Sequence, residues 1–240
     1  MASQTLKDGS SILYVMRVIA IIPAYNEEET IGDVIRETKK YVDDVIVIND
    51  GSTDRTEDVA KKAGAKVVSH VLNRGVGAAV RTGIKVALME DADYTIQIDG
   101  DGQHNAEYIP DFIKMAEKGY DIVIGSRFLN NSNKNFSFIR RTGIRFFSTI
   151  TNIFGNFRVT DVTSGYRLYN KKALESLSEN SDKHWAVEQT LEASKKNLKI
   201  KEISVKMPVR KRGLSQFDLG TYLMYPLRMI ETVLKVLIYR

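Results

Sequence analysis

The sequence predicts an α/β fold in which a mainly parallel sheet is covered by helices on both faces. Short β-branched apolar runs alternate with segments of helical periodicity through the first half of the chain. Strand-helix-strand order of this kind favours parallel pairing through crossover helices. The content of 43% hydrophobic and 27% charged residues is that of a globular protein with a sizeable core.

Several apolar runs are the predicted strands, because they are too short for helices and are mostly bounded by turn residues. In the first half they are Val18–Ile22, Val45–Ile48, Val67–Ser69, Tyr94–Ile98 and Ile122–Ile124. The second half is less regular, with predicted strands over Tyr166–Tyr169 and Ile203–Val209 and helices over Arg140–Phe154 and Trp185–Ser194.

Apolar residues recur at helical spacing in two segments between the early strands. The first pattern covers Ile31–Thr38, with Asn26 as the predicted N-cap and Glu29 three residues on. The second pattern covers Ile109–Ala116 and follows Asn105. Both helices therefore connect consecutive strands of the predicted sheet.

No internal repeat or low-complexity linker divides the chain, so we expect one domain with two appendages. Residues 1–16 form a flexible N-terminal tail, which is polar at its start and lacks the apolar segment of a signal peptide. Residues 17–217 form the domain, and residues 218–240 form an amphipathic helix. That helix either packs back on the domain or lies in a membrane interface. Its apolar residues are interrupted by charges, so no transmembrane helix is predicted.

Charge and cysteine content restrict the partners and the metal chemistry. The chain has 35 Lys and Arg against 30 Asp and Glu, a net charge of +5, and the excess is concentrated in residues 195–212. That stretch is either a solvated face or a surface for an anionic partner such as a lipid headgroup. The chain has no cysteine, which mildly favours a reducing compartment and leaves only oxygen or imidazole ligands for a metal.

Polar segments follow four of the predicted strands, at the position where open α/β sheets bind ligands. These segments are Pro23–Glu27, Asn49–Ser52, Asp99–His104 and Ser126–Arg127. Because the ends of parallel strands meet at one edge of a sheet, we expect the four segments to form a single site.

The segment Asp99–Gln103 indicates a divalent cation. Its two carboxylates are two residues apart after an apolar run, and Gly100 and Gly102 permit a turn that directs both toward one ion. A hard cation with few protein ligands keeps positions for water and substrate phosphates, which suits magnesium or manganese with a diphosphate. An EF-hand is not supported, since His104 and Pro110 occupy the positions of its glycine and its bidentate glutamate. An acidic turn without metal remains an alternative.

Other motifs are weaker. The segment Arg74–Val80 lacks the third glycine of a dinucleotide fingerprint, so close packing of a helix on the sheet is the favoured role of its glycines. His70, His104 and His184 lack metal-ligand spacing, and Ser164 lacks the context of a nucleophile. No basic motif of a nucleic-acid-binding module is present, so nucleic acid is not an expected partner.

Taken together, these motifs resemble the family 2 inverting glycosyltransferases, and most closely the dolichyl-phosphate mannose synthase and polyprenyl-phosphate glycosyltransferase branch. The resemblance spans Val18–Ser215 and implies a GT-A nucleotide-diphospho-sugar transferase fold. Its motifs are Ile22–Glu27, Asn49–Asp54, Asp99–His104, Gly125–Phe128, Asp161–Arg167 and Arg212–Ser215.

The resemblance also implies roles for individual residues. The base and ribose would lie against Pro23, Tyr25, Glu27, Ile48 and Asp50. The cation and diphosphate would be held by Asp99, Gly100, Asp101 and Gln103, with Asp99, Asp101 and Gln103 as the metal ligands. The donor and acceptor phosphates would be surrounded by Arg127, Arg140 and Arg212, which together with Asp101 are the expected catalytic residues. One departure is Gln216, which stands where the family usually has a lysine.

The expected reaction is transfer of a monosaccharide from GDP-mannose or a UDP-sugar to a polyprenyl or dolichyl phosphate, with Mg²⁺ or Mn²⁺ as cofactor. The expected location is the cytoplasmic face of a membrane, as a peripheral enzyme. A phosphate acceptor is already anionic, so no strong general base is required. One alternative is a hydroxyl acceptor, which needs a base such as Glu188 or Asp161. Another is a catalytically silent nucleotide-binding subunit.

Overall fold

The computed structural model describes residues 2–5, 11–14, 16–129, 138–155, 157–177, 185–207, 231–236 and 238. Its strands are β1 Ala2–Thr5, β2 Ser11–Tyr14, β3 Val18–Ala24, β4 Asp44–Asn49, β5 Lys66–Ser69, β6 Tyr94–Gln97, β7 Ile122–Ser126, β8 Arg167–Asn170 and β9 Ile200–Ser204. Its helices are α1 Ile31–Thr38, α2 Thr56–Lys62, α3 Val76–Met89, α4 Ile109–Glu117, α5 Phe138–Phe154, α6 Lys171–Leu177 and α7 Trp185–Lys195, with a 3₁₀ turn at Ala106–Tyr108. Residues 231–236 are also helical.

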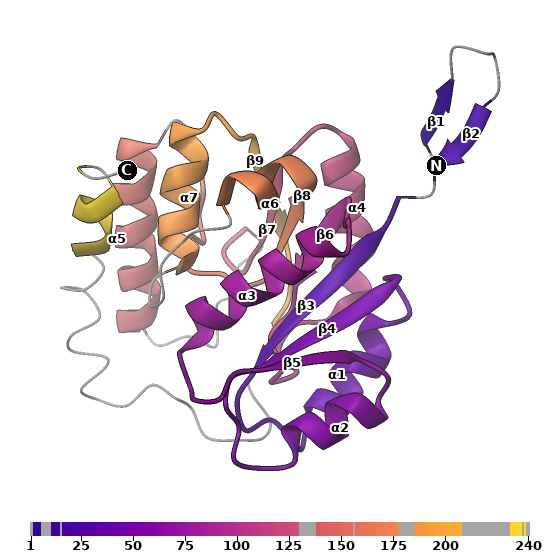
Figure 1. Ribbon diagram of the computed structural model, residues 1–240. Coiled ribbons are helices and arrows are strands. Elements are labelled where there is room, and N and C mark those ends of the chain that lie inside the picture. The colour runs from indigo at the N-terminus through magenta and orange to yellow at the C-terminus, as the bar shows by residue number, and fades with distance from the viewer. Residues whose placement is uncertain are drawn as a thin grey trace.

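Seven strands form one mixed sheet in the order β5-β4-β3-β6-β8-β7-β9 (Figure 1). Every pairing in it is parallel except those of β8, which runs antiparallel to both β6 and β7. The expected mainly parallel α/β sheet is therefore confirmed, with β8 as the exception. Because β6 and β7 both oppose β8, they run in the same direction and end at the same edge of the sheet.

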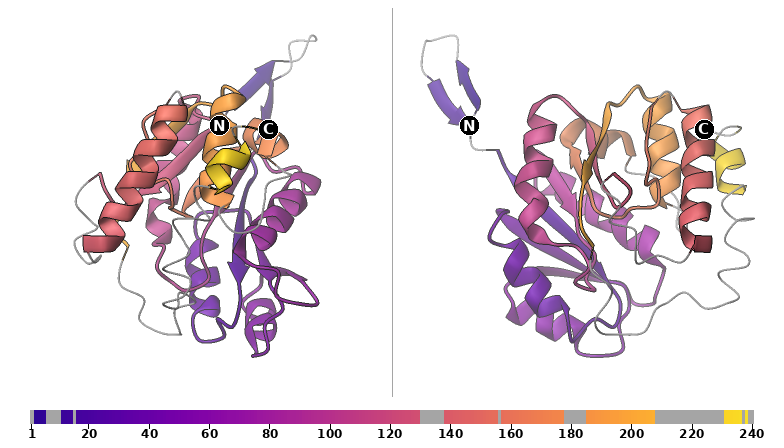
Figure 2. Two further views of the ribbon diagram at one scale, coloured as in Figure 1. Left: turned by 90° about the vertical axis from the view of Figure 1, so that its left-hand side faces the viewer. Right: turned by 180° about the vertical axis from the view of Figure 1, so that it is seen from behind.

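The core lies in two layers, one on each face of the sheet. One layer contains α3, α5, α6, α7 and the helical residues 231–236, and the other contains α1, α2 and α4 (Figures 1 and 2). Strand β3 shows why: all its residues are buried, with Ile19 and Ile21 in the first layer and Ala20 and Ile22 in the second. A strand covered on both faces is a continuous apolar run rather than an alternating one.

Asn26 does not cap α1, which corrects the prediction. The helix begins at Ile31 after Thr30, and no side chain caps it. Asn26 instead has a positive φ of 54°, and its Oδ1 accepts a hydrogen bond from the Thr53 backbone N–H. The Asn26 side chain therefore bonds to the segment after β4 instead of capping α1.

Strand β9 also differs from its prediction. It covers Ile200–Ser204, where it pairs in parallel with β7, whereas the sequence placed a strand at Ile203–Val209. The apolar residues Ile203 and Val205 that suggested the later position belong to the end of β9 and the segment after it. Residues 208 and 209 lie outside the described residues.

The described part of the C-terminal segment packs on the domain. Val233 and Val236 are buried in the layer that contains α5 and α7, and Lys195 Nζ donates to the Val236 carbonyl. Leu234 and Ile238 are 50% and 68% exposed. Within the described ranges, no helix is both long and apolar enough to cross a membrane.

The N-terminal residues contain a small sheet of their own. Strands β1 and β2 pair antiparallel, with Ala2 opposite Tyr14 and Thr5 opposite Ser11. Among the described residues, these two strands form a sheet separate from the seven-stranded one. The division of the chain into tail, domain and terminal helix stays a prediction.

Candidate active site

Three of the four polar segments expected at the strand ends are connected by hydrogen bonds at one edge of the sheet, and the fourth, Ser126–Arg127, follows β7 at the same edge. The Asn26 N–H donates to Ser52 Oγ over 3.0 Å, which joins the segments after β3 and β4. Thr30 Oγ1 donates to the Gly100 carbonyl over 2.8 Å, which joins the segments after β3 and β6. A Cβ on Gly100 would lie 3.3 Å from the Pro23 carbonyl oxygen, so glycine permits this close approach.

Asp50, expected in the nucleotide pocket, organises the loop before α3. Its carboxylate accepts hydrogen bonds from the backbone N–H groups of Arg74 and Gly75 and lies 2.7 Å from His70 Nδ1. The other ring nitrogen of His70 lies 2.9 Å from Thr82 Oγ1, so this histidine links Asp50 to α3. The carboxylate is buried, and the loop that it holds borders the segment after β4.

Gly75 is required for its backbone rather than for packing. Its φ is +90°, a conformation that side chains disfavour, and no atom of the described residues lies within 4 Å of the position of a Cβ. The packing role expected for the glycines of this segment therefore does not apply at Gly75.

The other residues expected to line the nucleotide pocket differ in exposure. Tyr25 is half-buried, whereas Pro23 and Glu27 are buried. Glu27 also accepts a hydrogen bond from Thr30 Oγ1. Ile48 is completely buried in the layer under α3. The assignment of these side chains to a nucleotide stays a prediction.

The acidic turn after β6 presents oxygen atoms from three side chains. Asp101 Oδ1 accepts a hydrogen bond from the Gln103 backbone N–H over 3.0 Å, and Gly102 between them has a φ of +75°. The Asp99 side chain is 38% exposed. The turn therefore contains two carboxylates and an amide, and the Asp99 carboxylate is partly exposed.

The buried side chain of His104 supports the acidic turn through a hydrogen bond to its backbone. Its Nδ1 accepts a hydrogen bond from the Asp99 N–H over 3.0 Å, its Nε2 lies 3.5 Å from Asp99 Oδ2, and its ring stacks on Tyr166. Burial lowers the pKa of His104 to about 4, so the ring is neutral at neutral pH. Since Nδ1 is an acceptor, Nε2 carries the proton and directs it toward the Asp99 carboxylate.

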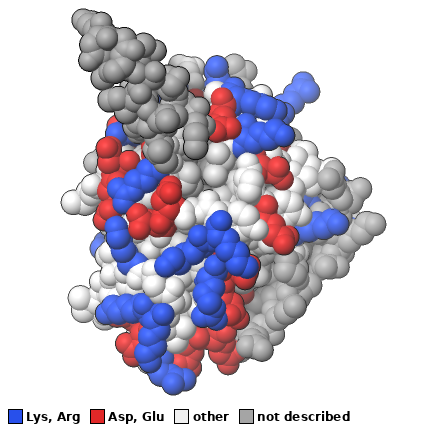
Figure 3. All heavy atoms as spheres, turned by 90° about the vertical axis from the view of Figure 1, so that its right-hand side faces the viewer, with Lys and Arg blue, Asp and Glu red and all other residues white. Residues whose placement is uncertain are grey.

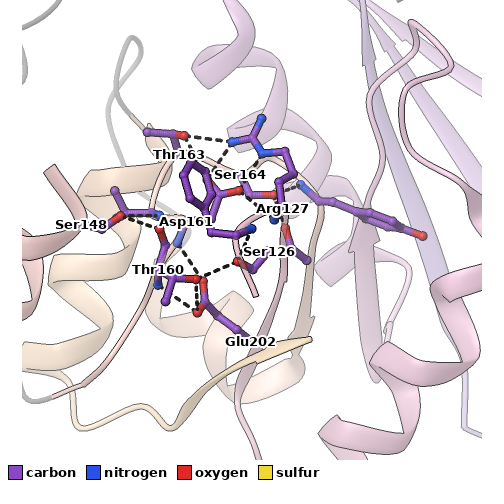
Figure 4. A network of polar contacts seen from close by, with 12 residues as sticks. Ser126, Arg127, Ser148, Thr160, Asp161, Thr163, Ser164 and Glu202 are labelled. Carbon is purple, nitrogen blue, oxygen red and sulfur yellow. Dashed lines mark hydrogen bonds and ion pairs between the residues drawn. The ribbon is translucent and has the colours of Figure 1, made fainter. Parts of the chain in front are cut away.

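Arg127 is fixed in a buried ion pair with Asp161 (Figure 4). The Asp161 carboxylate accepts from Arg127 Nε over 2.6 Å, from Nη2 over 2.7 Å and from the Arg127 backbone N–H over 3.1 Å. Arg127 Nη2 also donates to Thr163 Oγ1 over 3.0 Å. Sequence reasoning placed both charged residues near the reaction but did not predict this pairing.

A second carboxylate supports the ion pair. Glu202 on β9 accepts hydrogen bonds from the backbone N–H groups of Thr160 and Asp161, both over 2.9 Å. Burial raises the pKa of Glu202, and these hydrogen bonds counteract part of that effect. Glu202 was not among the predicted site residues, since its role depends on contacts 41 and 42 residues away in the chain.

The remaining predicted residues are described only in part. Glu188 is completely buried on α7. The backbone of Arg140 lies in α5, but the structure does not describe its side chain. Arg212, Gln216 and His184 lie outside the described residues. Their expected roles stay predictions.

The charged surface is mixed on the face shown in Figure 3, where Lys and Arg side chains lie among Asp and Glu side chains. In the late basic stretch, the Nζ atoms of Lys195 and Lys196 donate to backbone carbonyls, and Lys201 Nζ lies 5.8 Å from the centre of the Tyr120 ring. These lysines thus contact different parts of the fold. A surface for an anionic partner stays a prediction.

Comparison with known proteins identifies the class. The sequence profile described as "Glycosyl transferase family 2" matches residues 19–178, and the chain belongs to this family of glycosyltransferases. The match includes the strand ends after β3, β4, β6 and β7. It confirms both the expected family and the expected enzyme class.

Sequence relatives confirm the expected polyprenyl-phosphate branch. The UDP-N-acetylglucosamine–dolichyl-phosphate N-acetylglucosaminyltransferase of Methanococcus voltae is 34% identical over 212 residues, covering 79% of this chain and 84% of that protein. The undecaprenyl-phosphate mannosyltransferase of Micrococcus luteus is 30% identical over 217 residues, covering 85% of this chain and 89% of that protein. These names contain different sugars, so the relatives do not fix the sugar of this chain.

A solved structure confirms the GT-A fold. Glucosyl-3-phosphoglycerate synthase from Mycobacterium tuberculosis, in complex with Mn²⁺, uridine diphosphate and phosphoglyceric acid, superposes with a TM-score of 0.72. The match covers 92% of this chain and 78% of that one, at 20% identity. At this identity the likeness concerns the fold alone.

Proposed function

We propose that the chain transfers a monosaccharide from a nucleoside-diphosphate sugar to a polyprenyl phosphate, with inversion at the anomeric carbon and with Mg²⁺ or Mn²⁺ as cofactor. The observation that carries this proposal is the acidic turn of Asp99 and Asp101, at the same sheet edge as the fixed guanidinium of Arg127. Asp101 and Arg127 both lie close enough to influence the charge state of His104. The proposed cation site and the proposed anion-binding group would thus lie near the same histidine ring.

The donor set fits a hard divalent cation. Asp99 and Asp101 offer carboxylate oxygens and Gln103 offers an amide oxygen, the ligand type that Mg²⁺ and Mn²⁺ prefer. No cluster of three acidic, His or Cys side chains that could hold a metal occurs in the described part of the chain. An ion held by two carboxylates keeps coordination positions for phosphate oxygens. When bound, the cation would neutralise the charge of the departing diphosphate.

The nucleotide would lie between the segments after β3 and β4. Tyr25 is accessible there, and Asp50 holds the Arg74–Gly75 loop at the border of the same region. The M. voltae relative is named for a UDP-sugar, which supports a nucleotide sugar as donor. The candidate donors are GDP-mannose and UDP-sugars.

The chemical step is a single displacement. An oxygen of the lipid phosphate forms a bond to the anomeric carbon, and the bond from that carbon to the diphosphate oxygen breaks. The electron pair leaves with the nucleoside diphosphate. Arg127 would orient phosphate oxygens, with Arg140 and Arg212 as further contacts. Because the acceptor is already an anion, no proton has to be removed.

The two candidate bases for a hydroxyl acceptor are poorly placed, which favours the phosphate acceptor. The Asp161 carboxylate accepts hydrogen bonds from Arg127 and Thr163, so it already has a structural role. Glu188 is completely buried.

We propose a peripheral position at the cytoplasmic face of a membrane, supported by the exposed Leu234 and Ile238 and by the late basic stretch.

Two measurements test this function. Thermal shifts with GDP- and UDP-sugars, each with Mg²⁺ or Mn²⁺, should show one nucleotide raising the Tm in a cation-dependent manner. Transfer assays should then compare a polyprenyl phosphate with the corresponding polyprenol. Product is expected only with the phosphate. Equal transfer to the polyprenol would refute the proposed acceptor, and no cation-dependent shift with any donor would refute the proposed donor site.

A further inference from the structure

A buried amide on β6 lacks a hydrogen-bond partner directly beneath the acidic turn. Gln97 is fully buried, and neither its Nε2 nor its Oε1 bonds to any atom in the described part of the chain. An unsatisfied buried polar group costs about 1–3 kcal/mol. Buried groups of this kind are usually satisfied by ordered water.

Gly165 packs closely against polar atoms of both Gln97 and Asp99. The position of a Cβ on Gly165 would be 3.3 and 3.4 Å from the two carboxylate oxygens of Asp99 and 3.5 Å from Gln97 Nε2. Gln97 and Asp99 are two residues apart on an extended segment, so their side chains share a face. An amide donor and a carboxylate acceptor therefore converge on the same place.

We propose that a buried water molecule accepts a hydrogen bond from Gln97 Nε2 and donates one to the Asp99 carboxylate. Gln97 is then a positioning residue for a cation ligand. This inference rests on the proposed function, in which Asp99 binds the cation. His104 bonds the Asp99 backbone and lies beside its carboxylate, and the water would add a further contact to the Asp99 side chain. Loss of such an outer contact typically weakens metal binding about 10–100-fold.

The main test compares Gln97→Met with Thr95→Val. Thr95 lies on the same strand, is completely buried and also has an unpaired hydroxyl oxygen among the described residues, but it is two residues farther from the turn. Both variants replace an unpaired polar side chain by an apolar one of similar shape, a change that is often neutral for stability. We measure Mn²⁺ binding by electron paramagnetic resonance and Tm by circular dichroism, without donor. Gln97→Met should weaken Mn²⁺ binding roughly tenfold, and Thr95→Val should leave it unchanged.

A second variant, Gly165→Ala, tests the same water through a different residue. Gly165→Ala would place a methyl group against the Asp99 oxygens and Gln97 Nε2, and should also weaken Mn²⁺ binding about tenfold. It keeps the inference testable if Gln97→Met does not fold. A high-resolution crystal structure of the unaltered protein should show a water within hydrogen-bonding distance of Gln97 Nε2 and Asp99.

Several results would overturn the inference. These are unchanged Mn²⁺ binding in both Gln97→Met and Gly165→Ala, an equal loss in Thr95→Val, or a well-ordered site without the water. Failure of the unaltered protein to bind Mn²⁺ would instead contradict the proposed function and the inference together. The two kinds of failure are thus distinguished by the unaltered protein.

Discussion

The region from β3 to β6 and the region from β7 to β9 build their parts of the site in different ways. In the first region, β3 is an apolar run and most of the polar groups that are bonded across segments lie after the strand ends. Asp50, Ser52 and Thr30 bond to backbone groups of neighbouring segments. In the second region, charged groups lie inside the fold, as in the buried pair of Arg127 with Asp161.

The difference indicates a division of tasks. The loops of the first region contain oxygen atoms that could bind a cation and a nucleotide, and the buried carboxylate of Asp50 is satisfied there by backbone N–H groups rather than by a buried guanidinium. The second region fixes a guanidinium in one orientation, at the cost of removing two charges from water. Substitutions in the first region should therefore affect ligand binding more than stability, and those in the second should affect both.

The largest effect is expected for Asp101→Ala in the first region. Loss of a cation ligand removes several kcal/mol of charge stabilisation at the diphosphate, so transfer should fall by about 10³-fold or more. The fold should be kept, because Asp101 is not deeply buried and its hydrogen bond with the Gln103 N–H lies within the turn. Transfer assays with Mn²⁺ and circular dichroism check both statements. Asp58→Ala, on the exposed side of α2, is the control, and normal transfer by Asp101→Ala would refute the assigned role.

Asp161→Asn should have the next largest effect, and in the second region. It leaves the Arg127 charge buried without its partner, which should lower the free energy of unfolding by about 3–5 kcal/mol. Urea unfolding measures this change. Asp91→Asn removes an exposed ion pair with Lys171 and should not shift the unfolding midpoint.

A double variant separates stability from activity at this pair. Arg127→Met combined with Asp161→Leu removes both buried charges, so it should recover much of the lost stability. It should not recover transfer, because the proposed phosphate contact is gone. Recovery of both properties would mean that the pair is purely structural.

Gly75→Ala tests the first region through its backbone. At a φ of +90° an alanine is strained, with an expected cost of about 1–2 kcal/mol. Gly119→Ala is a matched control, since Gly119 has a φ of +89°, open space around a Cβ and a position remote from the strand ends. Both variants should lose similar stability in urea unfolding. Only Gly75→Ala should weaken nucleotide binding in titration calorimetry, and equal binding by both would exclude this loop from the pocket.

The sequence predicted the first region better than the second, for a physical reason. Local sequence patterns predicted strands β3, β4 and β6 and helix α1, and the structure contains each of these elements. Asn26 shows the limit even there, because its side chain is bonded to Thr53 rather than to the helix. That choice depends on a segment 27 residues away.

The second region depends on contacts that no local pattern contains. The run Tyr166–Tyr169 identified a strand but not its antiparallel direction, which follows from the path of the chain between β7 and β8. Arg127 and Asp161 are 34 residues apart, and their pairing appears only in the folded chain. The isolation of the Gln97 amide is likewise invisible in a sequence where it is one residue of an apolar run.

The smallest expected effect concerns Asp121, which joins the strands of the second region away from the site. Burial opposes ionisation of this carboxyl, but hydrogen bonds from the Lys199 N–H, the Asn170 amide and Lys172 outweigh it and lower its pKa. A lowered pKa means that Asp121 contributes stability at neutral pH and loses it as the pH falls through the folded-state pKa, below 3.8. Asp121→Asn should therefore cost about 1 kcal/mol at pH 7 and flatten the loss of stability on acidification. Urea unfolding from pH 7 to pH 3, with exposed Asp58→Asn as control, measures the slope. An unchanged slope would show that the acid sensitivity of the fold arises at other carboxylates.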